Sequence, residues 1–223
     1  MNGKQKNTNG LEHFIGHMIL ILTGATVALV VVMYLLHFII TREQTAVVTA
    51  KVDEPEIEEM YLTPNKYSRP QIPLEKVKGI VIHYTANPGS SAEANRNYFE
   101  GLKKKKKYAS SHFIVGLDGE IVQCVPLDEI AYASNERNDD TISIECCHED
   151  SSGKFSEATY KSVVALTAWL CGKYNLSEDD IIRHYDVTGK NCPKYYVKHE
   201  KAWKKLKKDV FSYISEHEES SGK

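Results

Sequence analysis

Three groups of side chains that could do chemistry stand where predicted strands end. His83 ends one short apolar run, Glu145 lies within another, and His184 and Cys192 belong to the polar stretch that follows a third. Loops at strand ends are where binding and catalytic residues concentrate. Two histidines and one cysteine would offer a zinc ion three nitrogen and sulfur ligands, with a fourth position left for water.

Spacing alone leaves two interpretations of these residues open. His83 stands far earlier in the chain than His184 and Cys192, and the latter two are not at the short spacing of a zinc finger. A strand-end histidine and a buried thiol would explain the same residues without a metal. A catalytic metal site is therefore one hypothesis, and a structural role is the other.

The elements that must position these residues mix strands with helices. Short apolar runs predict five strands, over 78–83, 111–116, 120–125, 141–146 and 180–183. Asp118-Gly119 between the second and third of these runs predicts a hairpin turn. A capping-box signature and apolar periodicity predict helices over 90–103, 156–174 and 198–215. This pattern indicates an α/β domain with a mixed sheet.

Three motifs, in order along the chain, carry a resemblance to a known family. They are Ile82–Asn87, Ser111–Val115, and His184-Tyr185-Asp186 followed by Gly189–Pro193. Together they resemble the type 2 N-acetylmuramoyl-L-alanine amidases, relatives of phage lytic amidases and peptidoglycan-recognition proteins, over residues 77 to 210. The resemblance implies a central mixed β-sheet flanked by helices, and it implies that His83, His184 and Cys192 hold Zn²⁺.

The resemblance also implies a reaction, which is hydrolysis of the amide between N-acetylmuramic acid and L-alanine in peptidoglycan. Zinc lowers the pKa of a bound water to about 7. Glu145 matches the acid of one branch of the family, which would move the water's proton to the leaving amine. Lys190 matches a cation that would stabilise the developing oxyanion. A solvated strand carboxylate and a surface lysine are the alternatives for these two residues.

Other positions could contact the substrate. Ser111 stands where some phage-type members have tyrosine, which favours Glu145 as the catalytic group. His112 is expected to line the cleft, with a structural, hydrogen-bonded histidine as the alternative. Thr85 and Asn87 are expected to contact glycan or peptide. A non-catalytic peptidoglycan-binding or sensing module of the same fold is a second functional hypothesis, and an amidase of another acyl-peptide is a third.

One long apolar run stands near the start of the chain, at residues 18–40, and His37 is its only ionisable residue. About 20 such residues span a bilayer, so the run predicts a transmembrane helix. It is longer than the apolar core of a signal peptide, and a buried core helix is the alternative. Residues 1–17 carry Lys4 and Lys6, and the positive-inside rule then predicts a cytoplasmic N-terminus and an extracytoplasmic domain in a single-pass membrane protein.

The remaining chain is predicted to divide into a proline-containing acidic linker over 41–76, an amidase domain over 77–216 and a polar tail over 217–223. The 28 basic and 30 acidic residues give a net charge of −2, which argues against a dedicated nucleic-acid binder. An apolar content of 42% argues against wholesale disorder. The four cysteines other than Cys192 are expected to be small buried side chains, with a Cys124–Cys146 disulfide as an alternative.

Overall fold

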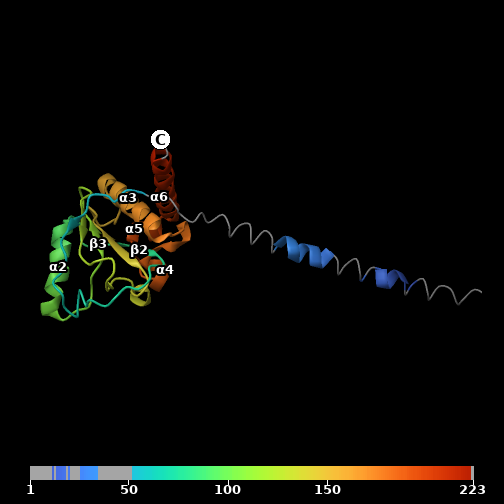
Figure 1. The fold of residues 1–223 in the computed structure, drawn as a ribbon, viewed down its shortest axis with the longest axis horizontal. Helices are drawn as coiled ribbons and strands as arrows, with labels where there is room; N and C mark the ends of the chain where they lie inside the picture. Colours follow the sequence, from blue (N-terminus) through green and yellow to red (C-terminus); the bar gives the residue numbers. More distant parts are fainter. Residues whose placement is uncertain (1–11, 13, 19, 21–25, 35–51, 222–223) are drawn as a thin grey trace, which may run out of the picture. The chain divides into compact units, whose positions relative to one another are not determined.

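The computed structural model describes residues 12, 14–18, 20, 26–34 and 52–221 (Figure 1). The chain divides into two compact units, residues 1–46 and 47–223. In the first unit, residues 14–18 and 26–34 are helical. Among the described residues, no helix has both the length and the apolar character needed to cross a membrane. About half of the predicted transmembrane segment 18–40 lies outside the described residues, and the segment stays a prediction.

A six-stranded sheet is the centre of the second unit, in the order β1-β4-β3-β5-β2-β6. Its strands are β1 (Glu58–Glu59), β2 (Ile80–Tyr84), β3 (Phe113–Val115), β4 (Ile121–Gln123), β5 (Ile142–Cys146) and β6 (Ile181–Arg183). The β3–β4 hairpin is antiparallel and the other neighbouring pairs are parallel. The predicted mixed sheet and hairpin are therefore confirmed. Gly119 has φ +90° in the hairpin turn, a conformation that favours glycine.

Helices cover both faces of this sheet. They are α2 (Ala92–Lys105), α3 (Glu157–Tyr174), α4 (His184–Thr188), α5 (Lys194–Lys198) and α6 (Glu200–Ser221). Figure 1 shows α2 on one side of the sheet and α3 with α6 on the other. The side chains of Ser91 and Ser156 accept hydrogen bonds from backbone N–H groups in the first turns of α2 and α3, which explains where both helices begin. Flanking helices were expected, and this part of the fold is confirmed.

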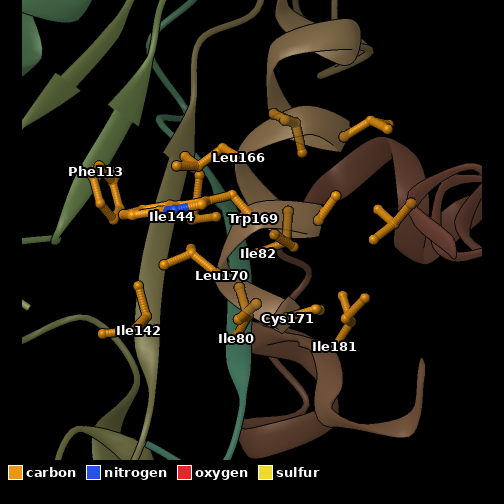
Figure 2. Close-up of a cluster of buried hydrophobic side chains, with 14 of the residues drawn as sticks. Ile80, Ile82, Phe113, Ile142, Ile144, Leu166, Trp169, Leu170, Cys171 and Ile181 are labelled. Atoms are coloured by element: carbon orange, nitrogen blue, oxygen red, sulfur yellow. The ribbon is translucent and has the colours of Figure 1, made fainter. Parts of the chain in front are cut away.

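In β2, strand alternation places Ile80 and Ile82 on one face of the sheet and His83 on the other. Ile80 and Ile82 of β2 are fully buried in the core that includes Trp169 and Leu170 of α3 (Figure 2). Successive side chains of a strand point to opposite faces, so His83 faces away from α3. The sheet therefore buries a large core on the α3 side and presents its chemical groups on the α2 side.

The predicted linker is wrong for the described part of its length. Residues 52–76 pack on the domain, where Leu62 is fully buried. The backbone N–H groups of Met60 and Leu62 donate to the carbonyls of Gln123 and Cys124, at 3.0 and 2.8 Å. This segment continues the edge of the sheet beyond β1, and prolines are tolerated at an edge because one side of the strand needs no donors. The domain therefore begins before residue 77.

The predicted C-terminal boundary of the domain and the predicted state of the cysteines can both be compared with the structure. Helix α6 continues to Ser221, so most of the predicted polar tail 217–223 is helical. Residues 200–221 contain no glycine or proline, and polar side chains alone do not end a helix. All five cysteines are free and buried, which confirms the expected small buried side chains and leaves no Cys124–Cys146 disulfide.

Candidate metal centre and active site

Two site residues come from adjacent strands of the sheet. His83 of β2 and Glu145 of β5 are register partners in parallel pairing, so their side chains are neighbours on the same face. The apolar residues around them in each strand are buried on the opposite face, which sets the direction of both polar side chains. The sheet therefore holds a histidine and a carboxylate side by side through main-chain pairing.

The second histidine follows the next strand along the sheet. β6 pairs in parallel with β2, and Arg183 is the register partner of Ile82, so His184 begins α4 beside His83. Arg183 is only 8% exposed. Its guanidinium binds the carboxylates of Asp186 and Glu200, each at 2.8 Å. These ion pairs fasten the start of α4, and with it His184, to the sheet and to α6.

A short return of the chain brings Cys192 back to the two histidines. Helix α4 ends at Gly189, whose φ of +76° reverses the chain. The N–H of Tyr185 then donates to the carbonyl of Cys192 at 2.9 Å. The ligand atoms of His83, His184 and Cys192 all lie within 4.8 Å of one another. The structure thus brings together the three residues that the sequence predicted as metal ligands.

The donor atoms of this cluster fit a zinc ion. His83 Nδ1 lies 3.8 Å from Cys192 Sγ. His184 Nδ1 is buried without a hydrogen-bond partner among the residues that the structure describes, so its lone pair is open toward the cluster. Burial lowers the pKa of His83 well below its usual range and also lowers the pKa of His184, which keeps both rings neutral. Two neutral imidazoles and one cysteine sulfur, bound as the thiolate, match the ligand types that zinc prefers.

The cysteine thiol holds its proton tightly when no metal is present. Burial raises the pKa of Cys192 to about 12, and the Glu145 charge acts in the same direction. Only a thiolate binds a metal, so metal binding at this position releases a proton. The hydrogen bond from the Tyr84 backbone and the nearby Lys190 charge lower the pKa and favour the thiolate. A metal held by this cluster would therefore bind more tightly as the pH rises.

Glu145 and Lys190 lie in the same cleft as the two histidines. The cleft has a volume of 390 Å³ and is lined by both histidines, Glu145 and Lys190 together with Asn135 and Tyr132. Glu145 Oε2 is buried without a hydrogen-bond partner among the described residues. Burial raises the pKa of Glu145 to about 8, against the opposing effect of the Lys190 charge. A carboxyl group with this pKa can both accept and release a proton near neutral pH.

The predicted substrate-contacting residues lie elsewhere. His112 is fully buried. The Ser143 N–H donates to its Nδ1 at 3.0 Å, and Nε2 lies 3.0 Å from the carbonyl of Glu129. His112 therefore has the structural role that was its alternative, and it does not line the cleft. Thr85 is half-buried and Asn87 exposed just beyond β2, and neither lines the cleft.

Sequence reasoning missed three polar residues of the turn before β5. His83 Nε2 lies 3.2 Å from Ser134 Oγ, and His184 Nε2 lies 2.9 Å from Asn135 Oδ1. Asn138 Oδ1 accepts hydrogen bonds from the N–H groups of Ala133 and Ser134. A run of polar loop residues was the only signal for them, and such runs are common in loops without any function.

Comparison with known proteins gives consistent matches over this domain. The family model for N-acetylmuramoyl-L-alanine amidase matches residues 73–195. A probable N-acetylmuramoyl-L-alanine amidase of Bacillus licheniformis is 41% identical over 147 residues, which are 60% of this chain and 41% of the relative. The amidase BlyA of Bacillus subtilis strain 168 is 35% identical over 176 residues, which are 70% of this chain and 47% of the relative. The chain thus spans less than half of each of these curated relatives.

Solved structures share the same architecture. The structure of PlyL superposes with a TM-score of 0.60 at 26% identity, covering 70% of this chain and 97% of that one. The catalytic domain of XlyA has a TM-score of 0.59 at 25% identity and covers 70% of this chain and 99% of that one. Both comparisons cover nearly the whole of the neighbour, so the similarity extends over a complete domain.

Proposed function

The chain belongs to the N-acetylmuramoyl-L-alanine amidase family, and from this membership we propose that it is a zinc-dependent hydrolase of peptidoglycan. The bond cleaved is the amide between N-acetylmuramic acid and L-alanine. One observation carries the proposal, which is that His83, His184 and Cys192 converge in a cleft that also holds Glu145. Relatives that are 35% to 41% identical are named as amidases of this kind, which supports the choice of substrate.

His83, His184 and Cys192 would hold the metal. Zinc at this position supplies Lewis acidity and lowers the pKa of a coordinated water. The buried histidines contribute by staying neutral, since a protonated imidazole has no lone pair to donate. The surrounding protein keeps bulk water away from all three side chains, because each is at least 95% buried. Electrostatic effects inside the cleft are therefore stronger than they would be in water.

Glu145 would move the proton that amide hydrolysis requires. The oxygen of water forms a bond to the amide carbon, and one proton of that water passes to Glu145. The C–N bond then breaks, and Glu145 gives the proton to the departing nitrogen, which becomes the free amine of L-alanine. Because burial raises the pKa of Glu145 to about 8, both transfers are feasible near neutral pH.

Lys190 would stabilise the charge that develops on the carbonyl oxygen. Lys190 is in the loop between α4 and Cys192 and is one of the residues that line the cleft. The charge of Lys190 lowers the pKa values of His83, His184 and Glu145, so its field reaches all three groups. A cation already placed near the reacting oxygen favours the transition state over the uncharged substrate.

We also propose that residues 18–40 anchor the protein in a membrane, with the N-terminus cytoplasmic and the amidase domain outside. The length and apolar character of this run support the proposal. Protease added to intact spheroplasts is expected to digest a C-terminal tag on the full-length chain and to spare an N-terminal one. Protection of the C-terminal tag, or release of the chain by salt washing, would contradict the anchored arrangement.

The hydrolase proposal is tested with the full-length chain, purified in detergent and loaded with zinc. Incubation with purified cell wall is expected to release new L-alanine amino termini, which mass spectrometry detects. Cys192→Ser and Glu145→Ala are expected to abolish the release, whereas Cys171→Ser changes a buried thiol of α3 outside the cluster and serves as the matched control.

Two results would count against this function. Equal cleavage by the wild type, Cys192→Ser and Glu145→Ala would overturn the assignment of the site. Wall binding that Cys192→Ser leaves unchanged, with no cleavage by the zinc-loaded wild type, would favour the non-catalytic sensing module instead.

A further inference from the structure

The turn over residues 133–138 contacts both candidate histidine ligands at the nitrogen that faces away from the cluster. His83 Nε2 lies 3.2 Å from Ser134 Oγ. His184 Nε2 lies 2.9 Å from Asn135 Oδ1. A neutral histidine has one protonated and one free nitrogen, and the hydrogen bond made by one of them decides which is free to bind a metal. This turn therefore bears on the state of both rings.

The contact with Asn135 selects one form of His184. The carbonyl oxygen of an asparagine side chain only accepts hydrogen bonds, so the proton of His184 must lie on Nε2. The lone pair is then on Nδ1, which is the buried atom without a partner among the described residues. On His83, the Ser134 hydroxyl lies beside Nε2 and can accept its proton, and Nδ1 faces Cys192 Sγ at 3.8 Å. Both rings thus present Nδ1 to the cluster.

Asn138 holds the turn in the shape that makes these contacts. Its Oδ1 accepts hydrogen bonds from two successive backbone N–H groups, Ala133 at 3.0 Å and Ser134 at 2.6 Å. An amide NH₂ group could not accept from either donor, which sets the orientation of the Asn138 side chain. Asn135 is the next residue after Ser134. It has φ +53°, a left-handed conformation that asparagine tolerates better than most residues. Asn138 thus acts on the histidines through Ser134 and Asn135.

We propose that the turn 133–138 is a positioning element of the metal centre, in which Asn138 orders Ser134 and Asn135 so that both histidines present Nδ1 to zinc. The inference rests on the proposed function, because it assigns a role toward the same metal. Asn135 and Asn138 are positioning residues and make no covalent contribution to the reaction. Their expected effect is on metal affinity and on the form of the metal-free histidines.

The experiment measures zinc affinity of the full-length chain by competition with a chelator. Asn135→Gly removes the acceptor while keeping the left-handed backbone accessible, and it is expected to weaken zinc binding by about 10- to 100-fold. Asn138→Ala is expected to weaken it in the same direction. Asn135→Asp and Asn138→Asp keep an oxygen acceptor and are expected to restore most of the affinity.

A second readout follows the metal-free protein by NMR of ¹⁵N-labelled imidazoles. In the wild type, His184 is expected to carry its proton on Nε2, and Asn135→Gly is expected to shift the proton toward Nδ1. This readout holds whether or not the chain binds zinc. If the wild type binds no zinc, the proposed function fails, while the position of the His184 proton still decides the role of the turn.

Asn65 supplies the matched control. Its Oδ1 accepts from the N–H groups of Tyr67 and Ser68, at 2.9 and 3.1 Å, so it makes the same pair of bonds in a turn that does not line the cleft. Asn65→Ala is expected to lower the unfolding temperature without changing zinc affinity or the His184 proton. Unchanged zinc affinity and an unchanged His184 proton in Asn135→Gly and Asn138→Ala would overturn the inference.

Discussion

The candidate site has two halves that are held in different ways. His83 and Glu145 are fixed by strands β2 and β5, where main-chain pairing sets their positions and a packed core lies on the opposite face. The turn 133–138 and the stretch 184–192 are fixed by polar side chains, chiefly Arg183 and Asn138. The first pair of residues forms the strand half of the site, and the turn with the stretch 184–192 forms the loop half.

The two halves are expected to respond differently to substitutions that remove a supporting contact. A paired strand holds a side chain through hydrogen bonds on both sides and a large buried surface, so we expect one substitution in the core to shift it little. A turn held by one carboxamide, or a helix start held by one guanidinium, depends on a few groups whose loss leaves buried polar atoms unpaired. Zinc affinity is therefore expected to be sensitive to the loop half and insensitive to modest changes in the strand half.

Glu145→Gln is expected to give the largest effect and to separate chemistry from metal binding. Loss of a positioned acid–base group reduces the catalytic rate by about 100- to 10,000-fold. Zinc affinity is expected to change far less than the rate, because Glu145 is not in the ligand cluster and acts on it only through the pKa of Cys192. Amide cleavage and chelator competition on the same preparations test both points. Glu149→Gln, which changes an exposed carboxylate just beyond β5, is the control. A fall in zinc affinity that parallels the fall in rate in Glu145→Gln would contradict the separation of chemistry from metal binding.

Arg183→Met tests the loop half through stability. It removes ion pairs to Asp186 and Glu200 and a hydrogen bond to the Tyr196 carbonyl, and we expect a loss of about 2 to 3 kcal/mol in the free energy of unfolding. Zinc affinity is expected to fall as well, because His184 begins the helix that these contacts fasten. Denaturant unfolding and chelator competition measure the two effects.

Arg69→Met is the matched control for that change. Arg69 forms a comparable ion pair with Glu129 at 2.8 Å and a hydrogen bond to the Leu62 carbonyl, but it lies in the segment 52–76. A similar loss of stability without a loss of zinc affinity is expected. Equal loss of affinity in both variants would mean that general destabilisation, and not the loop half, controls metal binding.

The strand half could be predicted from the sequence, because buried strands leave apolar runs and polar residues at their ends. The strand register that places Glu145 beside His83 could not be predicted from the sequence, because strand pairing depends on contacts between distant segments. His184 and Cys192 were singled out by their place after a predicted strand, but only the family motif assigned them as metal ligands. Ser134 and Asn138 were missed, since a polar turn has no periodicity, and β1 was missed because a two-residue edge strand leaves no pattern.

Glu100, a carboxylate outside both halves of the site, is expected to make the free energy of unfolding depend on pH in acid. Burial alone would raise the pKa of Glu100, but hydrogen bonds from Lys103 and from the Thr63 N–H outweigh it and lower the pKa to about 2. A group whose pKa is lower in the folded state stabilises the fold above its unfolded pKa of 4.5, and that stability is lost as the pH falls toward 2. The corresponding loss in the free energy of unfolding is about 2 kcal/mol. This figure converts the pKa shift of Glu100 into free energy and is reduced because the carboxylate is partly exposed.

Glu100→Gln checks this pH dependence. At pH 7 the variant is expected to be less stable than the wild type by that amount, and the gap is expected to shrink as the pH falls from 4.5 toward 2. Urea unfolding at a series of pH values measures the gap, with zinc affinity at pH 7 unchanged because Glu100 lies outside the cleft. A gap that stays constant with pH would show that the carboxylate charge is not its source.

Ile82→Val is expected to have the smallest effect and is the strictest test of the strand half. Ile82 is fully buried and immediately precedes His83, so a lost methylene costs about 1 kcal/mol in the free energy of unfolding. Because β2 is paired with β5 and β6 on its two sides, the backbone at His83 should not move, and zinc affinity should match the wild type. Ile214→Val, a similar buried change in α6, measures the cost of a methylene far from the ligands along the chain. If Ile82→Val weakens zinc binding and Ile214→Val does not, core packing behind the strand contributes to ligand placement, and the two halves differ less than their contacts indicate.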